Sequence, residues 1–254
     1  ERLLRPHADK IMVIDDLANR PHDCDLLLDQ NYYRDMERRY QGLVSAECVS
    51  LLGPEFVLLR PEFAVARKNI RERDGIVRRI LVFFGGSDPE NLTLKAIEAI
   101  QRLQRPDIAV DVVVGISNPH RAEIRERCEH MLNTTYYCQV ANMAEFMGRA
   151  DLALGAGGAT MWERCFLGLP SITVVFSANQ EKTTIDVASE EGIKYLGWAR
   201  QLEVQNYVDA IHWMISSHDK MRVIGDNALR LMGGKLSAGT LAVTKVMLDE
   251  GNAE

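Results

Sequence analysis

From Ile80 onward the chain alternates short β-type runs with segments of helical pattern, and this alternation constrains the fold more than any other feature. The β-type runs are ILVFF at 80–84, VDVVV at 110–114, TTYYC at 134–138, LALG at 152–155 and SITVV at 171–175. The segments between and after them predict helices over 91–104, 119–131, 142–149, 159–167 and 180–191. Strands that alternate with helices form a parallel sheet, so this part is predicted to be an α/β domain of the Rossmann type. Its ligand is expected beyond the carboxyl ends of the strands, where helix N-termini present unpaired N–H groups.

The first 79 residues show the same pattern in a shorter form. Strand-like runs occur at 10–15, 25–29 and 47–52, and the polar stretch 32–41 predicts a helix. Two or three strands make a poor independent core, so this region is predicted to be an incomplete Rossmann-like domain. Segment 53–75 predicts a crossover into a charged helix, followed by a turn at Asp74–Gly75.

We therefore expect an N-terminal remnant with its crossover over 1–75 and a ligand-binding domain over 76–254. The larger domain is expected to end in three further helices, over 203–217, 219–232 and 237–249.

Composition excludes several classes of protein. The chain has 254 residues and a formal net charge of -6, so nothing electrostatic recruits it to nucleic acid or to an anionic membrane. No apolar run approaches the roughly 18 residues that span a bilayer. The five cysteines are far apart and form no CxxC pair, which argues against a disulfide framework and favours a reducing cytoplasm. Asp15 and Asp16 lack an evident third ligand, so neither a metal nor a cofactor is expected.

The strongest local signal is a glycine-rich turn between an apolar strand and a helix. Gly155, Gly157 and Gly158 precede a helix that begins near Ala159 or Thr160. Glycine allows the backbone to approach a phosphate, and the N–H groups of the first helical turn donate to its oxygens. Glu163, one turn into the helix, could accept both hydroxyls of a ribose. The alternative is an ordinary tight turn with Glu163 exposed to solvent.

Three other loops follow predicted strands and could open onto the same cleft. Gly86 and Ser87 could meet a phosphate or a sugar, or else Asp88 and Pro89 could simply cap the next helix. Asn179 and Gln180 carry amides that suit sugar hydroxyl and N-acetyl groups, although Asn179 could instead cap the helix at 180–191. The loop 139–143, which contains Val140, could offer its backbone to a planar base.

His22 is the most suggestive of the six histidines, because it lies among four aspartates in the loop 15–25. Catalysis is one interpretation, and a structural role is the commoner one for a loop histidine. Trp162, Trp198 and Trp213 are interpreted as packing residues.

Five motifs occur in order along nearly the whole chain: DDLANRPHDCDLLLDQN (15–31), GPEFVLLRPEF (53–63), FGGSDPENLT (84–93), GAGGATMWERCFLGLPSI (155–172) and ANQ (178–180). Together they resemble the UDP-sugar hydrolases of pseudaminic acid biosynthesis, a family similar to the MurG-type glycosyltransferases with their GT-B arrangement of two Rossmann domains. The resemblance implies metal-independent hydrolysis of UDP-2,4-diacetamido-2,4,6-trideoxy-β-L-altropyranose to UDP and the free sugar.

The resemblance also implies roles for individual residues. Gly157, Gly158 and Thr160 would hold the diphosphate, Glu163 the ribose, and the loop 139–143 the uracil. Asn179 and Gln180 would hold the sugar, with Asn179 as the residue placed in the catalytic centre.

One family feature is missing. Members carry a GxGHxxR loop after their first strand, and its histidine is the proposed base, but no histidine in this sequence follows a glycine. We therefore expect that the first part of the protein is absent from this chain and that it binds UDP with little turnover of its own. Two alternatives stay open, namely a GT-B glycosyltransferase with a UDP-sugar donor and a nucleotide-binding module without activity.

Overall fold

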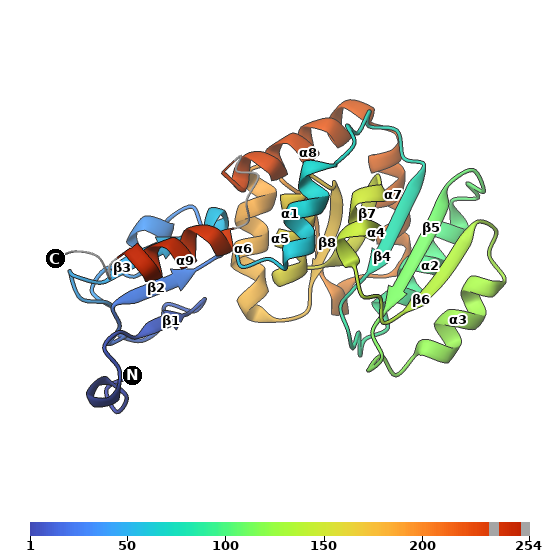
Figure 1. Cartoon of the computed structure of the whole chain (residues 1–254). Coiled ribbons are helices and arrows are strands. Elements are labelled where there is room, and N and C mark those ends of the chain that lie inside the picture. The colour runs from blue at the N-terminus through green and yellow to red at the C-terminus, as the bar shows by residue number, and fades with distance from the viewer. Residues whose placement is uncertain (234–238, 250–254) are drawn as a thin grey trace.

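The computed structural model describes residues 1–233 and 239–249, whose strands form two separate parallel sheets (Figure 1). The larger sheet has the order β6-β5-β4-β7-β8-β9. Its strands are β4 (Arg79–Phe83), β5 (Ala109–Val114), β6 (Thr134–Cys138), β7 (Leu152–Ala156), β8 (Ser171–Val175) and β9 (Lys194–Trp198). This is the doubly wound order of a Rossmann domain, with its reversal between β4 and β7. The predicted α/β fold is therefore confirmed, and a ligand is expected where β4 and β7 end.

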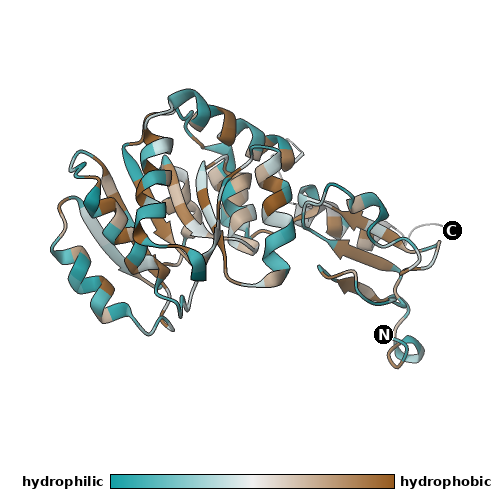
Figure 2. Cartoon of the chain, turned by 180° about the vertical axis from the view of Figure 1, so that it is seen from behind, coloured by the Kyte–Doolittle hydropathy of each residue, from teal (hydrophilic) through white to brown (hydrophobic). Residues whose placement is uncertain are grey.

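Alternate residues of the strands enter two cores on opposite faces of this sheet. Ile80 and Val82 of β4 pack into one core, whereas Leu81 between them packs into the other. The first core includes residues of α2 (Leu92–Arg102), α3 (Arg121–Glu129) and α7 (Val204–Ile215). The second includes residues of α1 (Pro61–Lys68), α4 (Met143–Arg149), α5 (Ala159–Phe166) and α6 (Ala178–Ser189), and α8 (His218–Leu231) contributes to both. Helices thus cover both faces, and Figure 2 shows apolar residues along the strands with hydrophilic ones on the outer helix surfaces.

The smaller sheet has the order β1-β2-β3 and is also parallel. Its strands are β1 (Met12–Ile14), β2 (Leu26–Asp29) and β3 (Val49–Leu52). Helix α9 (Gly239–Asp249) lies against it, because Val243 is buried with Leu26, Leu28 and Leu51 (Figure 1). The helix expected over 237–249 therefore covers the small sheet and not the large one. Positions 237 and 238 of that predicted range lie outside the described residues.

The helix expected at 32–41 is wrong, since only the short 3-10 helix Met36–Arg38 forms there. Side chains of this segment are held by the loops around it. The Tyr40 hydroxyl lies 3.0 Å from a carboxylate oxygen of Asp15 and 3.0 Å from one of Asp29, and Arg39 donates to the Asp16 carbonyl at 2.6 Å. These long-range polar contacts hold the backbone of residues 32–41 in an irregular conformation instead of a regular helix.

The crossover between the sheets forms as expected, with α1 as the charged helix. Gly75 has a φ of 83°, and the Asp74 carboxylate accepts a hydrogen bond from the Ile76 N–H at 3.0 Å. The predicted turn at Asp74–Gly75 is therefore confirmed.

The two sheets are joined through the segment that follows β2. The Thr183 hydroxyl of α6 donates to the Tyr32 carbonyl at 3.0 Å, and Lys182 pairs with Asp35 at 3.0 Å. The fully buried Trp162 of α5 donates from Nε1 to Asn31 at 3.1 Å, which agrees with its expected packing role. These contacts place the loops of the small sheet beside the N-terminal end of α6.

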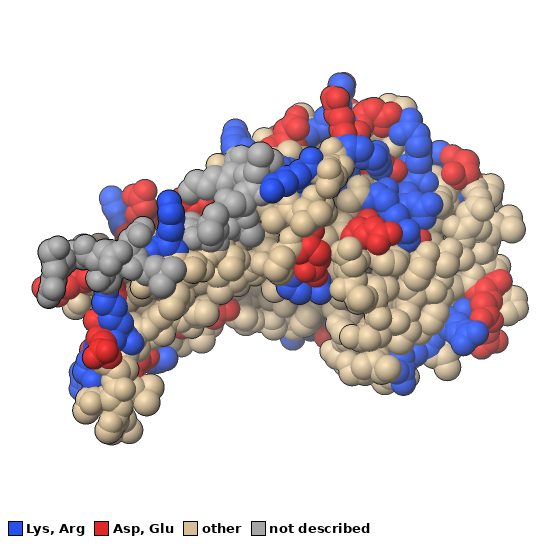
Figure 3. Space-filling model, in the orientation of Figure 1, with Lys and Arg blue, Asp and Glu red and all other residues tan. Residues whose placement is uncertain are grey.

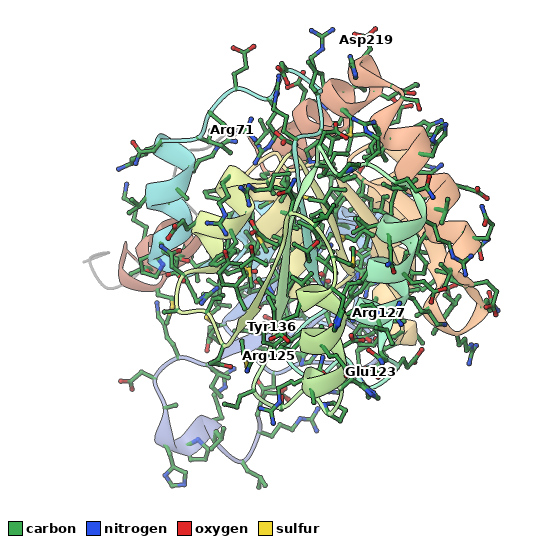
Figure 4. The ribbon with its side chains drawn as sticks, turned by 90° about the vertical axis from the view of Figure 1, so that its right-hand side faces the viewer. Arg71, Glu123, Arg125, Arg127, Tyr136 and Asp219 are labelled. Carbon is green, nitrogen blue, oxygen red and sulfur yellow. The ribbon has the colours of Figure 1, made fainter. Side chains whose placement is uncertain are left out.

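The surface carries charges of both signs. On the face drawn in Figure 3, basic and acidic side chains are interspersed. Figure 4 places Arg125 of α3 near Tyr136 of the edge strand β6, whereas Glu123 and Arg127 lie on the other side of that helix. No helix among the described residues has the length and apolar character needed to cross a membrane.

Candidate functional site

A cleft of about 230 Å³ opens at the carboxyl ends of β4 and β5. It is lined by Arg60, Phe83, Gly86, Val113, Val114, Gly115, Gln139, Val140, Met143, Thr160 and Glu163. The cleft thus brings together four residues proposed from the sequence, namely Gly86 in the loop after β4, Val140 in the loop after β6, and Thr160 and Glu163 on α5. It lies beside the reversal of strand order, where doubly wound sheets bind their ligands.

Glu163 forms part of the cleft wall on α5. Its side chain is 14% exposed, and its Oε1 lies 3.6 Å from Nη2 of Arg60. Burial raises the pKa of the Glu163 carboxyl, and the positive charge of Arg60 opposes that rise. Glu163 is therefore not a solvent-exposed helix residue, and its carboxylate can accept hydrogen bonds from a ligand in the cleft.

Arg60 is a site residue that the sequence reasoning missed. It precedes Pro61, the first residue of α1, and has the extended backbone (φ -63°, ψ 148°) that a following proline favours. This conformation holds its half-exposed side chain between Glu62, at 3.0 Å, and Glu163. The available signal was its position in the motif at 53–63, directly before the helix-starting proline.

The glycine-rich turn between β7 and α5 packs closely against α6. A Cβ on Gly157 would lie 2.9 Å from the Thr184 hydroxyl oxygen, and Gly158 has a φ of 84°. A Cβ on Gly158 would lie 3.3 Å from Nε2 of Gln180, so Gln180 lies directly beside the turn. The N-terminus of α5 therefore begins where the turn and the cleft meet, with Thr160 in the lining of the cleft.

Asn179 lies in the first turn of α6 and is not the residue that caps it. The cap position is Ser177, whose hydroxyl donates to Asn179 Oδ1 at 2.7 Å, so the capping alternative for Asn179 is wrong. Asn179 Nδ2 donates to Asp16 Oδ2 at 3.4 Å, across to the loop that follows β1. Asn179 and Gln180 thus continue the site from the turn toward the small sheet, beyond the residues that line the cleft.

The loop after β4 combines a capping function with a place in the cleft. Asp88 is buried and accepts hydrogen bonds from the N–H groups of Leu92 and Thr93, each at 2.9 Å, so it satisfies donors at the start of α2, although the N-cap position is Asn91 and Pro89 does not begin the helix. Gly86 lines the cleft, and its carbonyl accepts from the Ser117 hydroxyl at 3.1 Å. Ser87 is exposed and lies outside the residues that line the cleft.

The loop 139–143, which is proposed to contact the uracil, begins with a sharp turn directly after β6. Gln139 has a φ of 56°, which is uncommon for a residue with a side chain. Its N–H donates to the Val114 carbonyl at 2.9 Å, and its Oε1 accepts from the Ile116 N–H at 3.3 Å. The turn therefore holds Val140 among the residues that line the cleft.

His22 is buried in the loops of the small sheet. Its Nδ1 lies 3.0 Å from Glu1 Oε1 and its Nε2 lies 3.6 Å from Asp15 Oδ2. No histidine is among the residues that line the cleft. Its burial outside the cleft favours the structural interpretation of His22.

Asp15 and Asp16 do not assemble a metal centre in the part of the chain that the structure describes, where no group of three His, Cys, Asp or Glu residues is suitably placed. The Asp15 carboxylate accepts instead from the Ala18 N–H at 2.8 Å and from the Tyr40 hydroxyl.

Comparison with known sequences gives a family match over the larger sheet and α7. The model of the glycosyltransferase family 28 C-terminal domain matches residues 80–216. The spore coat polysaccharide biosynthesis protein SpsG of Bacillus subtilis (strain 168) is 28% identical over 200 residues, which cover 78% of this chain and 57% of that protein. The UDP-2,4-diacetamido-2,4,6-trideoxy-beta-L-altropyranose hydrolase of Campylobacter jejuni is 25% identical over 181 residues, which cover 71% of this chain and 63% of the relative. The resemblance drawn from the five motifs is thereby confirmed.

Solved structures support the fold. MurG of Acinetobacter baumannii aligns with a TM-score of 0.63 at 11% identity, over 96% of this chain and 68% of that chain. WaaG, a glycosyltransferase involved in lipopolysaccharide biosynthesis, aligns with a TM-score of 0.53 at 16% identity, over 97% of this chain and 80% of that one. The chain spans less than two thirds of the length of the curated relatives that it matches, between 33% and 63%.

Proposed function

The chain belongs to the glycosyltransferase family 28 C-terminal domain family, and on that premise we propose that it binds the UDP part of a UDP-sugar in the cleft beside β4 and β7. The uracil lies against the loop that contains Val140, the ribose hydroxyls donate to Glu163, and the diphosphate lies on the turn Gly157–Thr160. The sugar extends past Gln180 toward Asn179.

One observation carries this proposal. Gly86, Val140, Thr160 and Glu163 follow three different strands, and they line one cleft at the reversal of strand order. A nucleotide needs a surface for its base, an acceptor for its ribose and N–H donors for its phosphates. The Val140 loop, the Glu163 carboxylate and the first turn of α5 at Thr160 are the groups of the cleft that we propose for these three parts.

We further propose that the reaction is hydrolysis of UDP-2,4-diacetamido-2,4,6-trideoxy-β-L-altropyranose, which releases UDP and the free sugar. The support is the relative from Campylobacter jejuni, which carries that activity in its name, together with the five motifs. Asn179 is the residue of this chain proposed to stand at the reacting sugar.

Glycosyl transfer is the second candidate, and the family match favours it, because that family is named for glycosyltransferases. Both reactions use the same UDP site and differ in whether water or a hydroxyl of an acceptor attacks the sugar. In the whole protein, release of UDP from the sugar nucleotide without any added acceptor supports hydrolysis, whereas strict dependence on an acceptor supports transfer.

Calorimetry with UDP, ADP and NAD, each with and without EDTA, tests the binding proposal. We expect UDP to bind more tightly than ADP and NAD, with an affinity that EDTA leaves unchanged. Preference for NAD, or loss of UDP binding in EDTA, would overturn it.

A further inference from the structure

Beneath the glycine-rich turn lies a cation whose charge the described part of the chain leaves without an ion-pair partner. Arg164 of α5 is 1% exposed, and no carboxylate of the described residues lies within 4.0 Å of its guanidinium. Burial lowers the pKa of Arg164 to about 10, and Glu163 opposes that shift only as a nearby charge. Removing a cation from water is unfavourable unless an anion compensates it.

The guanidinium of Arg164 contacts both ends of the turn. Its Nη2 donates to the carbonyl of Ala156, the last residue of β7, at 2.7 Å. Its Nη1 donates to Thr160 Oγ1 at 3.3 Å, in the first turn of α5. Its Nε has no hydrogen-bond partner among the described residues.

This contact explains Gly155 in physical terms. A Cβ at Gly155 would lie 2.6 Å from Nη1 of Arg164 and 2.7 Å from the Phe83 carbonyl oxygen. Only a residue without a side chain lets the guanidinium lie between β4, β7 and β8, where it also donates to Thr173 Oγ1 at 3.3 Å. The first glycine of the motif therefore admits Arg164, while Gly157 and Gly158 shape the turn itself.

The hydrogen bond to Thr160 determines what that residue can offer a ligand. Because the Thr160 oxygen accepts from Arg164, its own hydrogen is available to donate in another direction. Thr160 lines the cleft, so that donor is available to a ligand there. A hydroxyl that accepts from a cation is also polarised as a donor, since hydrogen bonds in a chain strengthen one another.

We propose that Arg164 is a positioning residue for the diphosphate. It supplies a buried positive charge under the turn, and it orients the Thr160 hydroxyl as a hydrogen-bond donor to the diphosphate. This inference rests on the proposed function, in which the diphosphate lies on the turn. The ligand supplies the negative charge that the described protein groups around Arg164 do not, so the site selects ligands by their phosphate charge as well as by their base.

The test compares Arg164→Met and Arg164→Lys with the unmodified chain. Binding of UDP, uridine and inorganic pyrophosphate is measured by calorimetry, and thermal unfolding without ligand shows that each variant is folded. We expect Arg164→Met to weaken UDP by about tenfold or more and uridine by less than about threefold, because hydrogen bonds and charge at the phosphates are lost while the base and ribose contacts remain. Arg164→Lys retains the charge and should recover much of the UDP affinity.

The outcomes separate this inference from the proposed function. Equal weakening of UDP and uridine by Arg164→Met, or no weakening of either, would overturn the role of Arg164 while UDP binding by the unmodified chain still stands. Failure of the unmodified chain to bind UDP would overturn the proposed function, and the pyrophosphate titrations then test the role of Arg164 on their own. If pyrophosphate binds the unmodified chain but not Arg164→Met, the result supports an anion site on the turn. If pyrophosphate binds both proteins equally, or binds neither, that anion site is refuted.

A second pair of variants keeps the inference testable if Arg164→Met does not fold. Thr160→Val removes the hydroxyl that Arg164 orients, and Thr160→Ser retains it. We expect Thr160→Val to weaken UDP and pyrophosphate selectively, with uridine little affected and Thr160→Ser close to the unmodified chain. If the valine and serine variants bind UDP equally well, the hydroxyl is not the donor.

Discussion

Asn179 Nδ2 lies 3.4 Å from Asp16 Oδ2, in a hydrogen bond that joins α6 of the larger sheet to the loop after β1 of the smaller one. Both groups end at the carboxyl side of their sheets, the side on which parallel α/β folds bind ligands. The proposed sugar site therefore lies between the two sheets, whereas the proposed uracil and ribose sites belong to the larger sheet alone.

This arrangement predicts that Asn179→Ala weakens a UDP-sugar but not UDP. The amide is expected to contact only the sugar, because Asn179 lies beyond the residues that line the UDP cleft. Calorimetry with both ligands measures the difference, for which about threefold to tenfold is expected from one or two hydrogen bonds.

Asp35→Ala is the matched control for that variant, because it breaks the exposed Lys182–Asp35 pair at the same junction and removes no proposed site group. If Asp35→Ala weakens the UDP-sugar as much as Asn179→Ala does, the effect comes from a loosened junction and the assignment of Asn179 fails.

Glu163→Ala is expected to weaken UDP by about 1.5–3 kcal/mol, because hydrogen bonds to a charged acceptor are lost. Uracil and inorganic phosphate should bind as before, since the proposed contact is to the ribose hydroxyls alone. Titrations of the three ligands against this variant and the unmodified chain provide the measurement. A parallel loss for all three would indicate a folding defect.

The pH dependence of uridine binding tests the state of the same carboxyl. Burial raises the pKa of Glu163, and the ionised form is the one that accepts two ribose hydroxyls. Uridine affinity should therefore be full well above that raised pKa and should fall as the pH decreases through it, at a higher pH than for an ordinary glutamate. Uridine is the appropriate ligand because it has no phosphate to titrate.

Glu163→Gln is the control for the pH experiment, because its amide keeps the shape of the side chain but does not ionise in this range. Its uridine affinity should be weaker and nearly independent of pH. A decrease of the same size in the glutamine variant would assign the titration to another group.

Gly155→Ala is expected to destabilise the fold by about 1–3 kcal/mol, because the new methyl group overlaps the Phe83 carbonyl and the Arg164 guanidinium. The matched control is Gly148→Ala on α4, where a Cβ would meet no atom within 4 Å and alanine favours a helix by about 1 kcal/mol. Urea unfolding of both variants measures the difference. Equal stability of the two would show that the backbone relaxes around Gly155.

The sequence predicted the strands whose residues are buried on both faces. β4, β5, β7 and β8 are rich in apolar residues, with Asp111 as the one charged residue inside β5, so their positions and the loops at their carboxyl ends could be recognised without a structure. The edge strand β9 was missed, because Lys194–Trp198 is half-buried throughout and contains Gly197 at a φ of 121° beside a register shift in β8. Such a strand carries neither the apolar run nor the alternation that marks one in a sequence.

The residues missed at the site are two arginines, for a common physical reason. Arg60 reaches Glu163 from a segment about 100 positions earlier in the chain. Arg164 is buried, although nothing in the sequence of α5 predicts that an arginine at this position is inaccessible to solvent. Long charged side chains are usually exposed, so their burial or pairing depends on tertiary contacts. The glycines were found, but the close approach of Arg164 to Gly155 became evident only from the packing.

Residues 1–254 alone are expected to bind UDP and yet to release it from a UDP-sugar at or near the background rate. A base must come within about 2.6–3.2 Å of the attacking water, or one water further. Among the described residues, Glu163 is the one carboxylate that lines the cleft, and it lies against Arg60 and is assigned to the ribose. General acid–base catalysis contributes typically about 10²- to 10⁴-fold, so without it UDP affinity persists while turnover nearly disappears.

A coupled assay of UDP release from the altrose nucleotide, run beside UDP calorimetry on the same sample, provides both measurements. Turnover of about 1 s⁻¹ or more, an ordinary enzymatic rate, would mean that the base lies within this sequence. His22→Gln would then be the first variant to assay, and its loss of activity would replace the structural interpretation of the Glu1–His22–Asp15 contact with a catalytic one.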